Sequence, residues 1–389
     1  MSRLNELIAE LCPDGVEYRQ LSDVFNTRNG YTPSKANPEF WENGTVPWFR
    51  MEDIRENGRI LSDAIQKVSR SAVKGDLFPA NSIIVATSAT IGEHALLTVE
   101  SLANQRFTYL MVKPEYKNRF DMKFIFYYCF KLDAYCLECL NQGNFASVDM
   151  KKFNKFPIPV PPLPVQREIV RILDNFTELT AELTAELTAR QKQYKFYADM
   201  LFDAAIDVKP TTLEEISENC DFLRKPVTSG KREAGTIPYY GASGIVDYVK
   251  DYIFDGDYLL ISEDGANLLA RSTPIAFSIT GKTWVNNHAH ILKFPSMVTQ
   301  KYVERYLNLI DLTPYITGAA QPKLNQKNLN MIQIPLPPME EQQRIMGILD
   351  RFDSITNDIT SGLPAEITAR QKQYEYYRDK LLTFKSVDR

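Results

Sequence analysis

The hydrophobic positions of this chain alternate between two patterns. In residues 16–160, short β-prone runs such as Ser82–Thr87 and Phe107–Val112 lie between turn residues, which is typical of strands. From Val165 to Leu201 the apolar residues recur in steps of three and four, and this coiled-coil seam predicts one helix about 55 Å long. A second strand-rich region begins near Thr211, and a second helical stretch follows it. Shorter helices are predicted at 2–12, 122–140 and 299–309.

The helical segments are two copies of one sequence, and the second copy has gained four residues. An internal repeat of this length indicates that one structural unit was duplicated. Three matches carry the repeat: Ile158–Pro162 with Ile334–Pro338, Ile172–Asp174 with Ile348–Asp350, and Thr188–Tyr194 with Thr368–Tyr374.

A seam of this length needs a partner, and the second copy is the nearest candidate. Two equivalent helices joined by a whole domain can pair antiparallel. This predicts an α+β fold, in which two similar α/β domains are separated by two long antiparallel helices that form a coiled coil, with a pseudo-twofold internal repeat. The alternative is two separate amphipathic helices, each packed on its own domain. Ser361–Pro364 supplies the four extra residues of the second copy, and because a proline inside a helix costs about 3 kcal/mol, we expect a break near Gly362.

The repeat divides the chain into a first domain at 1–160, a helical region at 161–208, a second domain at 209–337 and a second helical region at 338–389. The two domains repeat each other more faintly than the helices do: their frame residues agree, and most others differ. The matching segments are Gly44–Phe49 with Gly235–Tyr240, Ala103–Gln105 with Val285–Asn287, and Leu21–Asp23 with Ile216–Glu218.

Composition narrows the class of protein. Hydrophobic content of 44% and charged content of 24% are values of a globular protein, and 389 residues suit two or three domains. The net charge of −4 argues against a protein that coats nucleic acid non-specifically, but a DNA reader inside a complex can borrow phosphate contacts from its partners. No apolar run approaches 18 residues and the first residues lack a signal-peptide layout, so we expect a cytoplasmic protein with no membrane segment. Five irregularly spaced cysteines indicate buried thiols.

The usual catalytic and cofactor motifs are not recognisable. Gly281–Thr283 resembles the end of a phosphate-binding loop, but Ala276 stands where its first glycine belongs, so we interpret it as a surface turn. The C-x-x-C of residues 136–139 has no second pair for zinc. His288 and His290 would share one face of a strand, yet no third ligand is evident. We therefore predict neither a catalytic nor a metal site.

Polar and aromatic residues occupy corresponding loop positions in both domains. Arg, Asn, Gln and Lys can read base edges, and Lys, Ser and Tyr can position phosphates. Exposed loops are usually polar, but duplicated domains with a shared frame and different loops fit better with reading two short words on one DNA. We predict that one half-site contacts Trp48, Arg50, Asn104, Gln105, Arg106, Asn141, Gln142, Asn144 and Ser147. We predict that the other contacts Tyr239, Tyr240, Ser243, Lys282, Asn286, Asn287, His288, Gln321 and Lys323.

The Ile-Pro-x-Pro-Pro stretches, the Ile-Leu-Asp-x-Phe motifs, the TAEL runs of Thr180–Leu187 and the shared QKQY helix ends resemble the specificity subunit of type I restriction–modification systems. The resemblance covers the whole chain and is specific in the helices. It implies a non-catalytic subunit whose two target-recognition domains read a bipartite double-stranded DNA sequence with a non-specific gap. The conserved helical regions would dock two methyltransferase (modification) subunits, which carry S-adenosylmethionine and methylate adenine. Restriction/translocase subunits with ATP and Mg would then join, and no cofactor is expected on this chain.

Two other classes of protein stay open. A stand-alone enzyme, for example a nuclease, would need a metal cluster. A coiled-coil scaffold or adaptor that does not bind DNA would explain the helices alone. The spacer gives a discriminating prediction, because Thr180–Leu187 is TAEL written twice. A third TAEL unit would add about 6 Å of helix and should lengthen the gap between half-sites without altering either word.

Overall fold

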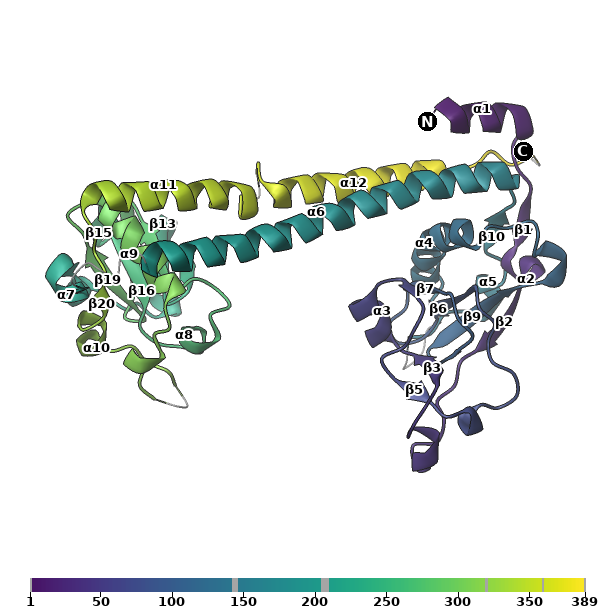
Figure 1. Ribbon diagram of the computed structural model, residues 1–389, viewed down its shortest axis with the longest axis horizontal. Coiled ribbons are helices and arrows are strands. Elements are labelled where there is room, and N and C mark those ends of the chain that lie inside the picture. Colours follow the sequence, from purple (N-terminus) through teal and green to yellow (C-terminus); the bar gives the residue numbers. More distant parts are fainter. Residues whose placement is uncertain (1, 142–145, 204–209, 319–320, 359, 388–389) are drawn as a thin grey trace. The chain divides into compact units, whose positions relative to one another are not determined.

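The computed structural model describes residues 2–141, 146–203, 210–318, 321–358 and 360–387 (Figure 1). The chain forms two compact units. Unit 1 consists of Met1–Glu182 and Thr368–Arg389, and unit 2 consists of Leu183–Ile367. The long helix α6, Leu163–Asp203, is continuous over 41 residues, as its apolar seam predicted, and the unit boundary falls in its middle. Sheets and helices are mixed in both units, which confirms the α+β class.

The main sheet of unit 1 has five strands in the order β2, β9, β6, β7, β4. Its side chains alternate between two buried faces. Ile83 and Val85 pack under helix α4 (Met122–Glu138), whereas Ile84 and Ala86 pack against a second, three-stranded sheet. Two buried faces explain the nearly continuous apolar runs of the sequence. The strands are β2 (Phe25–Asn29), β4 (Ile60–Leu61), β6 (Ser82–Ala86), β7 (His94–Leu97) and β9 (Phe107–Val112), and the second sheet contains β3 (Val46–Phe49), β5 (Lys67–Val68) and β8 (Leu102–Ala103).

Short elements complete unit 1 and bring its two chain segments together. The backbone N–H of Val16 donates to the carbonyl of Lys385, 2.8 Å away, so the start of the chain is tied to its end. The apolar face of α1 joins the same core as Leu381 and Leu382. These elements are α1 (Ser2–Leu11), β1 (Tyr18–Gln20), α2 (Leu21–Val24), α3 (Met51–Asn57), α5 (Met150–Phe153), β10 (Pro157–Pro159) and the C-terminal part of α12 (Leu363–Leu381).

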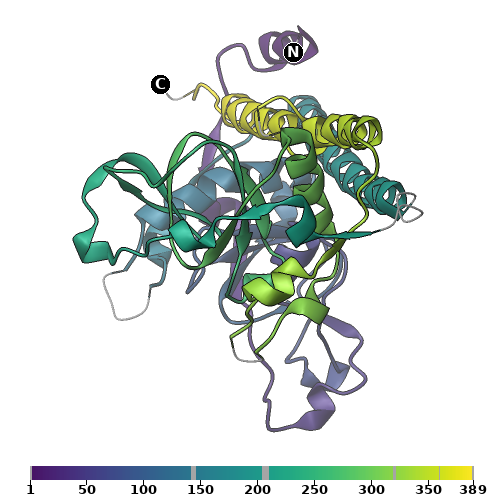
Figure 2. The same ribbon diagram turned by 90° about the vertical axis from the view of Figure 1, so that its left-hand side faces the viewer.

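Unit 2 repeats this plan and is drawn mostly in teal and green in Figure 2. It contains two four-stranded sheets. The first has the order β12, β19, β16, β17 and carries helix α9 on β16 and β17; the second has the order β14, β13, β18, β15. The strands are β11 (Thr211–Thr212), β12 (Glu218–Asn219), β13 (Ala234–Gly241), β14 (Gly244–Val249), β15 (Phe254–Asp255), β16 (Tyr258–Ser262), β17 (Ala276–Ile279), β18 (Lys282–Val285), β19 (Ala289–Lys293) and β20 (Gln333–Ile334). The helices are α7 (Leu213–Ile216), α8 (Asn267–Ala270), α9 (Met297–Leu309), α10 (Gln326–Asn330) and α11 (Met339–Thr356).

The strand register relates the two domains residue by residue. β3 and β8 run parallel with Phe49 opposite Ala103, and β13 and β18 run parallel with Tyr240 opposite Val285. Two of the predicted correspondences, those that begin at Gly44 and Ala103, are therefore confirmed.

The correspondence of Leu21–Asp23 with Ile216–Glu218 is wrong. Leu21 donates its backbone N–H to Phe156, and the equivalent bond in unit 2 runs from Leu213 to Ile332. Both short helices also begin with a capping box, which ends at Asp23 in one and at Glu215 in the other. The true counterpart is thus Leu213–Glu215, because the match of Ser-Asp with Ser-Glu had displaced the alignment by one helical turn.

Residues of the helical repeat make the same contacts in both units. Gln166 donates from Nε2 to the Pro161 carbonyl at 2.7 Å, and Gln342 donates to Pro337 at 2.7 Å. The aspartate of each Ile-Leu-Asp motif holds the helix on its own domain: Asp174 accepts from Lys123 and Tyr127 of α4, and Asp350 accepts from Arg305 of α9. The repeated letters therefore encode one way of fixing a domain to its helix.

Each unit also contains a pair of helices. In unit 1, Phe176 of α6 stacks on Tyr377 of α12 with ring centroids 5.6 Å apart, and earlier residues of α6 share a core with Leu381. In unit 2, Tyr197 of α6 packs on Phe352 of α11 at 5.7 Å. Further along α6, Leu201 shares a core with Ile345, which precedes Phe352, so the pairing is antiparallel in unit 2 as it is in unit 1. The helices therefore do not pack only on their own domains.

The second helical copy is broken, as its sequence predicted. α11 ends at Thr356, and α12 begins at Leu363 with Pro364 in its first turn, where a proline removes no helical hydrogen bond. The interruption starts at Asn357, so it is longer than the proline alone requires. No helix in the described part of the chain combines the length and apolarity needed to cross a membrane.

Candidate nucleic-acid interface

In domain 1 (residues 1–160), the predicted loops meet at one edge of the main sheet. The backbone N–H of Asn104 donates to Phe49 at 3.0 Å, that of Thr87 donates to Arg106 at 3.0 Å, and that of Val148 donates to Thr87 at 2.9 Å. This ladder joins four segments that are distant in sequence. We call the surface they form the loop edge of domain 1: Arg50, Thr87–Ala89, Asn104–Arg106, Asn141 and Ser147.

Domain 2 (residues 209–337) builds the same ladder from different residues. Asn286 donates to Tyr240 at 3.0 Å, Glu263 to His288 at 2.9 Å, and Leu324 to Glu263 at 2.8 Å. Every one of these bonds has its counterpart in domain 1. The loop edge of domain 2 consists of Tyr240–Ser243, Glu263–Gly265, Asn286–His288, Gln321 and Lys323.

The two edges therefore present different side chains on one frame. Those exposed in domain 1 are Gln105, Arg106 and Asn141, with Arg50, Asn104 and Ser147 half-buried. Those exposed in domain 2 are Ser243, Asn287, His288, Gln321 and Lys323, with Tyr240 half-buried.

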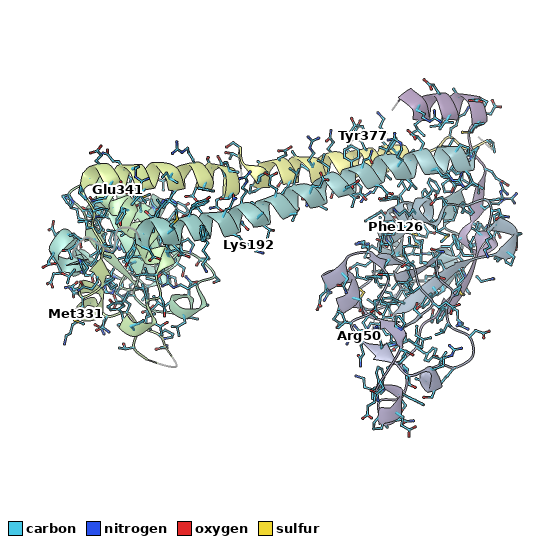
Figure 3. All side chains as sticks on the ribbon, viewed as in Figure 1. Arg50, Phe126, Lys192, Met331, Glu341 and Tyr377 are labelled. Atoms are coloured by element: carbon cyan, nitrogen blue, oxygen red, sulfur yellow. The ribbon has the colours of Figure 1, made fainter. Side chains whose placement is uncertain are left out.

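Arg50 follows β3 on the side of unit 1 that lies away from Tyr377 (Figure 3). Its guanidinium carbon lies 5.6 Å from the centroid of the Trp48 ring, and an oxygen of Glu52 is 3.9 Å from Nε. Nε is buried and has no hydrogen-bond partner among the described residues. A buried donor without a partner is costly, so this guanidinium is suited to a ligand that supplies an acceptor.

Trp48 and Tyr239 belong to the cores of their domains. Trp48 is 4% exposed and donates from Nε1 to the Tyr31 carbonyl at 3.0 Å; Tyr239 is 1% exposed and its hydroxyl accepts from the Val227 N–H at 2.9 Å. Burial removes both from the surface that DNA could contact. The sequence placed them wrongly because aromatic residues at strand ends serve cores as readily as surfaces.

Two predicted asparagines use their side-chain oxygens to shape the loops. Asn104 accepts the Arg106 N–H at Oδ1, and Asn286 accepts the His288 N–H in the same way, at 3.0 and 2.8 Å. Such turns around an asparagine fix the two residues that follow it. Lys282 lies at the other end of β18 from Asn286, with Nζ 4.6 Å from the Tyr252 ring centroid, so it stands apart from the loop edge. Gln142 and Asn144 lie outside the described residues.

The sequence did not predict the residues at the centre of each loop edge. Thr87–Ala89 and Glu263–Gly265 follow the buried central strands β6 and β16, and both segments bond to two other loops. They also share an unusual backbone: φ is +65° at Ala89 and +109° at Gly265. Polar residues directly after a buried strand were the available signal.

A charged cluster supports the edge of domain 2. Glu263 accepts from Arg224 at 2.6 Å and lies 3.0 Å from the Lys323 ammonium. Burial opposes the charged form, but the bonds from Arg224 and Lys323 hold the pKa of Glu263 below its usual value. Lys323 is thereby oriented while half of its side chain stays exposed.

His288 and His290 do not share a face, so that prediction is wrong. β19 begins at Ala289, which leaves His288 in the loop, exposed and 2.9 Å from Asp264. His290 is buried, with Nδ1 2.6 Å from Asp221 and Nε2 2.7 Å from the Leu324 carbonyl.

The cysteines and the turn at Gly281 agree with what the sequence predicts. All five cysteines are buried and free, and burial raises the pKa of the Cys136 thiol to about 12. Within the described ranges, no group of three His, Cys, Asp or Glu side chains is placed to hold a metal ion. Gly281 forms a turn between β17 and β18 with φ of +73°, as a surface turn requires.

Two domains of one fold whose edges carry different polar side chains define a protein with two distinct recognition surfaces. The chain matches the family described as type I restriction modification DNA specificity domain over residues 13–190 and 206–369. It belongs to this family, the specificity subunits of type I restriction–modification systems.

Relatives span most of the chain. The EcoprrI specificity subunit of Escherichia coli is 46% identical over 380 residues, which cover 92% of this chain and 93% of that protein. The EcoR124I/EcoR124II specificity subunit of Escherichia coli is 36% identical over 305 residues, covering 69% and 72%. Solved structures share the fold at low identity. A chain from a study of complex assembly and conformational transition of the type I system has a TM-score of 0.63 at 15% identity, covering 96% of this chain and 98% of that one. The S subunit from M. genitalium has a TM-score of 0.50 at 16% identity, covering 94% and 95%.

Proposed function

We propose that this specificity subunit reads a bipartite DNA target, one half-site with each loop edge. The observation that carries the proposal is the ladder shared by the two domains. The same backbone bonds hold corresponding loops in both, while the exposed side chains differ. Two domains can recognise two different short base sequences if the backbone framework stays the same and the polar side chains change. Bases are distinguished by side-chain donors and acceptors. A coiled-coil scaffold that does not bind DNA is not favoured, since it gives these edges no role.

The edge of domain 1 is rich in guanidinium groups. Arg50 and Arg106 are suited to the paired acceptors of guanine or to phosphates, and Gln105 and Asn141 to adenine. In domain 2, Asn287 and Gln321 offer amides, whereas Lys323 and His288 are oriented by Glu263 and Asp264. We propose that Trp48, Tyr239 and Lys282 make no base contact.

The chain is proposed to be non-catalytic and cytoplasmic. Its sequence carries no recognisable cofactor motif, and the proposed division of labour places S-adenosylmethionine, ATP and Mg on partner subunits. Methylation and cleavage would then depend on where this chain holds those partners along the DNA.

The helical repeat offers two matching surfaces for partners. Phe196 is 63% exposed and Tyr376, its counterpart in the repeat, is 61% exposed. Each ring packs edge-on against the next aromatic residue of its helix, at 5.5 and 5.3 Å. Exposed aromatic residues are typical anchors of protein interfaces. We propose that each one docks one of two methyltransferase (modification) subunits, after which the restriction/translocase subunits join.

Methylation mapping tests the reading of two half-sites. The chain is expressed with its modification subunits, and methylated adenines are sequenced genome-wide for the wild type, Arg106→Ala and His288→Ala. Arg106→Ala should relax or change bases in one half of the target only, and His288→Ala bases in the other half only. Lys192→Ala, an exposed change on α6, serves as the control (Figure 3). An unchanged target in both edge variants, or a change in both halves from one substitution, would contradict the proposal.

A further inference from the structure

The register assigns Arg50 of domain 1 a surprising counterpart in domain 2. Phe49 and Tyr240 occupy the same place in the two parallel strand pairs, and each accepts the backbone bond of the following asparagine loop. The next residue is Arg50 in domain 1 and Gly241 in domain 2. The sequence match of Gly44–Phe49 with Gly235–Tyr240 implies the same pairing. The edge of domain 2 therefore lacks a side chain where the edge of domain 1 has a guanidinium.

Another side chain fills the place that this glycine leaves open. A Cβ atom on Gly241 would lie 3.1 Å from Cγ1 of Val246 and 3.3 Å from Nδ2 of Asn286. Such distances are tighter than ordinary van der Waals contact, so the isopropyl group of Val246 already occupies the space. The absence of a side chain at Gly241 thus makes room for Val246. The isopropyl group of Val246 lies where the first side-chain atoms of Arg50 lie in domain 1.

Val246 is 56% exposed, and Ile245 and Tyr248 of the same strand are exposed as well. Val246 lies on β14, the edge strand of its sheet, three residues after Ser243. Single exposed apolar residues are normal on proteins. Val246 differs from them because it stands at the position of a predicted DNA-reading arginine and beside Asn286, a residue of the ladder itself.

We propose that Val246 contacts the 5-methyl group of a thymine in the half-site read by domain 2. This inference rests on the proposed function. In the major groove the thymine methyl group is the apolar feature that marks a base pair, whereas an arginine matches the paired acceptors of guanine. The two domains therefore use one position for opposite chemistry: a guanidinium in domain 1 and an isopropyl group in domain 2.

Deoxyuridine substitution isolates the contact, because uracil lacks only the methyl group of thymine. The complete complex with its modification subunits is measured on its mapped target, with each thymine of the domain 2 half-site replaced in turn. For the wild type, one replacement should weaken binding about fourfold, the value of one buried methyl group. The Val246→Ala complex should bind the thymine target more weakly than the wild type does. Replacing that thymine by uracil should not weaken its binding further. Ile245→Ala, the neighbour on β14, should keep the full uracil effect, as should every replacement in the other half-site.

Several outcomes would overturn the assignment. One is a wild type that responds to no uracil; another is a Val246→Ala complex that responds like the wild type. If the wild-type complex failed to distinguish its target from scrambled DNA, the proposed function would fail instead. If the alanine variant does not fold, Val246→Thr, which keeps the branched shape, can be measured on the same thymine and uracil targets. It should show a reduced uracil effect at the same position, and an undiminished effect would count against the contact.

Discussion

The buried ionic cluster of domain 2 provides a test of how its edge is supported. Both ring nitrogens of His290 face oxygen atoms: Nδ1 lies 2.6 Å from the Asp221 carboxyl and Nε2 lies 2.7 Å from the Leu324 carbonyl. Asp221 also accepts the Ile291 N–H at 2.9 Å and lies 3.2 Å from Arg224. In domain 1, Thr108 holds the position of His290 and Asn29 that of Asp221, and both are neutral. The Thr108 hydroxyl donates to the Asn29 side chain at 2.8 Å.

Asp221→Ala should therefore destabilise domain 2 strongly. It leaves the half-buried Arg224 guanidinium, the buried His290 ring and the Ile291 N–H without their partner, and removing one partner of a buried pair costs about 3–5 kcal/mol. Asp221→Asn should cost about 1 kcal/mol, because the amide oxygen can still accept from Ile291 while the amide NH₂ stays within hydrogen-bond reach of the His290 ring. Asn29→Ala in domain 1 removes one neutral bond at an exposed residue and should cost about 1 kcal/mol or less.

The pH dependence follows from the carboxyl group of Asp221. Burial opposes its charge, yet the bonds from His290 and Ile291 and the charge of Arg224 hold the pKa of Asp221 below its ordinary value. A lowered folded-state pKa gives stability that is present above the unfolded value, about 3.9, and is lost as pH falls through the folded-state pKa. The difference between the wild type and Asp221→Ala should accordingly be full at neutral pH and shrink below about pH 4.

Hydrogen exchange followed by mass spectrometry reports each domain separately. Peptides from β16 and β19 should lose protection about a hundredfold or more in Asp221→Ala, the kinetic equivalent of roughly 3 kcal/mol, whereas peptides from β6 and β9 should not change. Equal losses in Asp221→Ala and Asp221→Asn would refute the reasoning, since they would show that the charge pair has no role beyond a single hydrogen bond.

Three further predictions concern the backbone, the partner surfaces and the spacer. Ala89→Gly should stabilise domain 1 by about 0.5–1 kcal/mol in urea unfolding, because it relieves a left-handed backbone at φ +65°; the same change at Ala86, inside a strand, should destabilise it. Phe196→Ala and Tyr376→Ala should each reduce the complex by one modification subunit in native mass spectrometry, and retention of both copies in the double variant would exclude these anchors. A third TAEL unit after Leu187 adds about 6 Å to α6 and should lengthen the gap in the methylated target; an altered word at constant gap would contradict a spacer role.

The sequence by itself determined the architecture, because that architecture is written in periodic patterns. Steps of three and four predicted α6, Pro364 predicted the break before α12, and the collinear repeat predicted two domains of one fold. Such features depend on local periodicity and on backbone chemistry that is the same in any environment. The pairing of antiparallel helices followed from the length of the seam.

Tertiary structure alone decided the chemistry of the two edges. The sequence could not show that Trp48 and Tyr239 turn inward, or that Thr87–Ala89 and Glu263–Gly265 form the centre of each edge, because burial depends on which strands become neighbours. The strand register confirms that Arg50 and Gly241 hold the same place at the two edges, and only the packing of β14 shows that Val246 fills the space beside Gly241. Residues at a binding edge are brought together by contacts between distant segments, and no local pattern records those contacts.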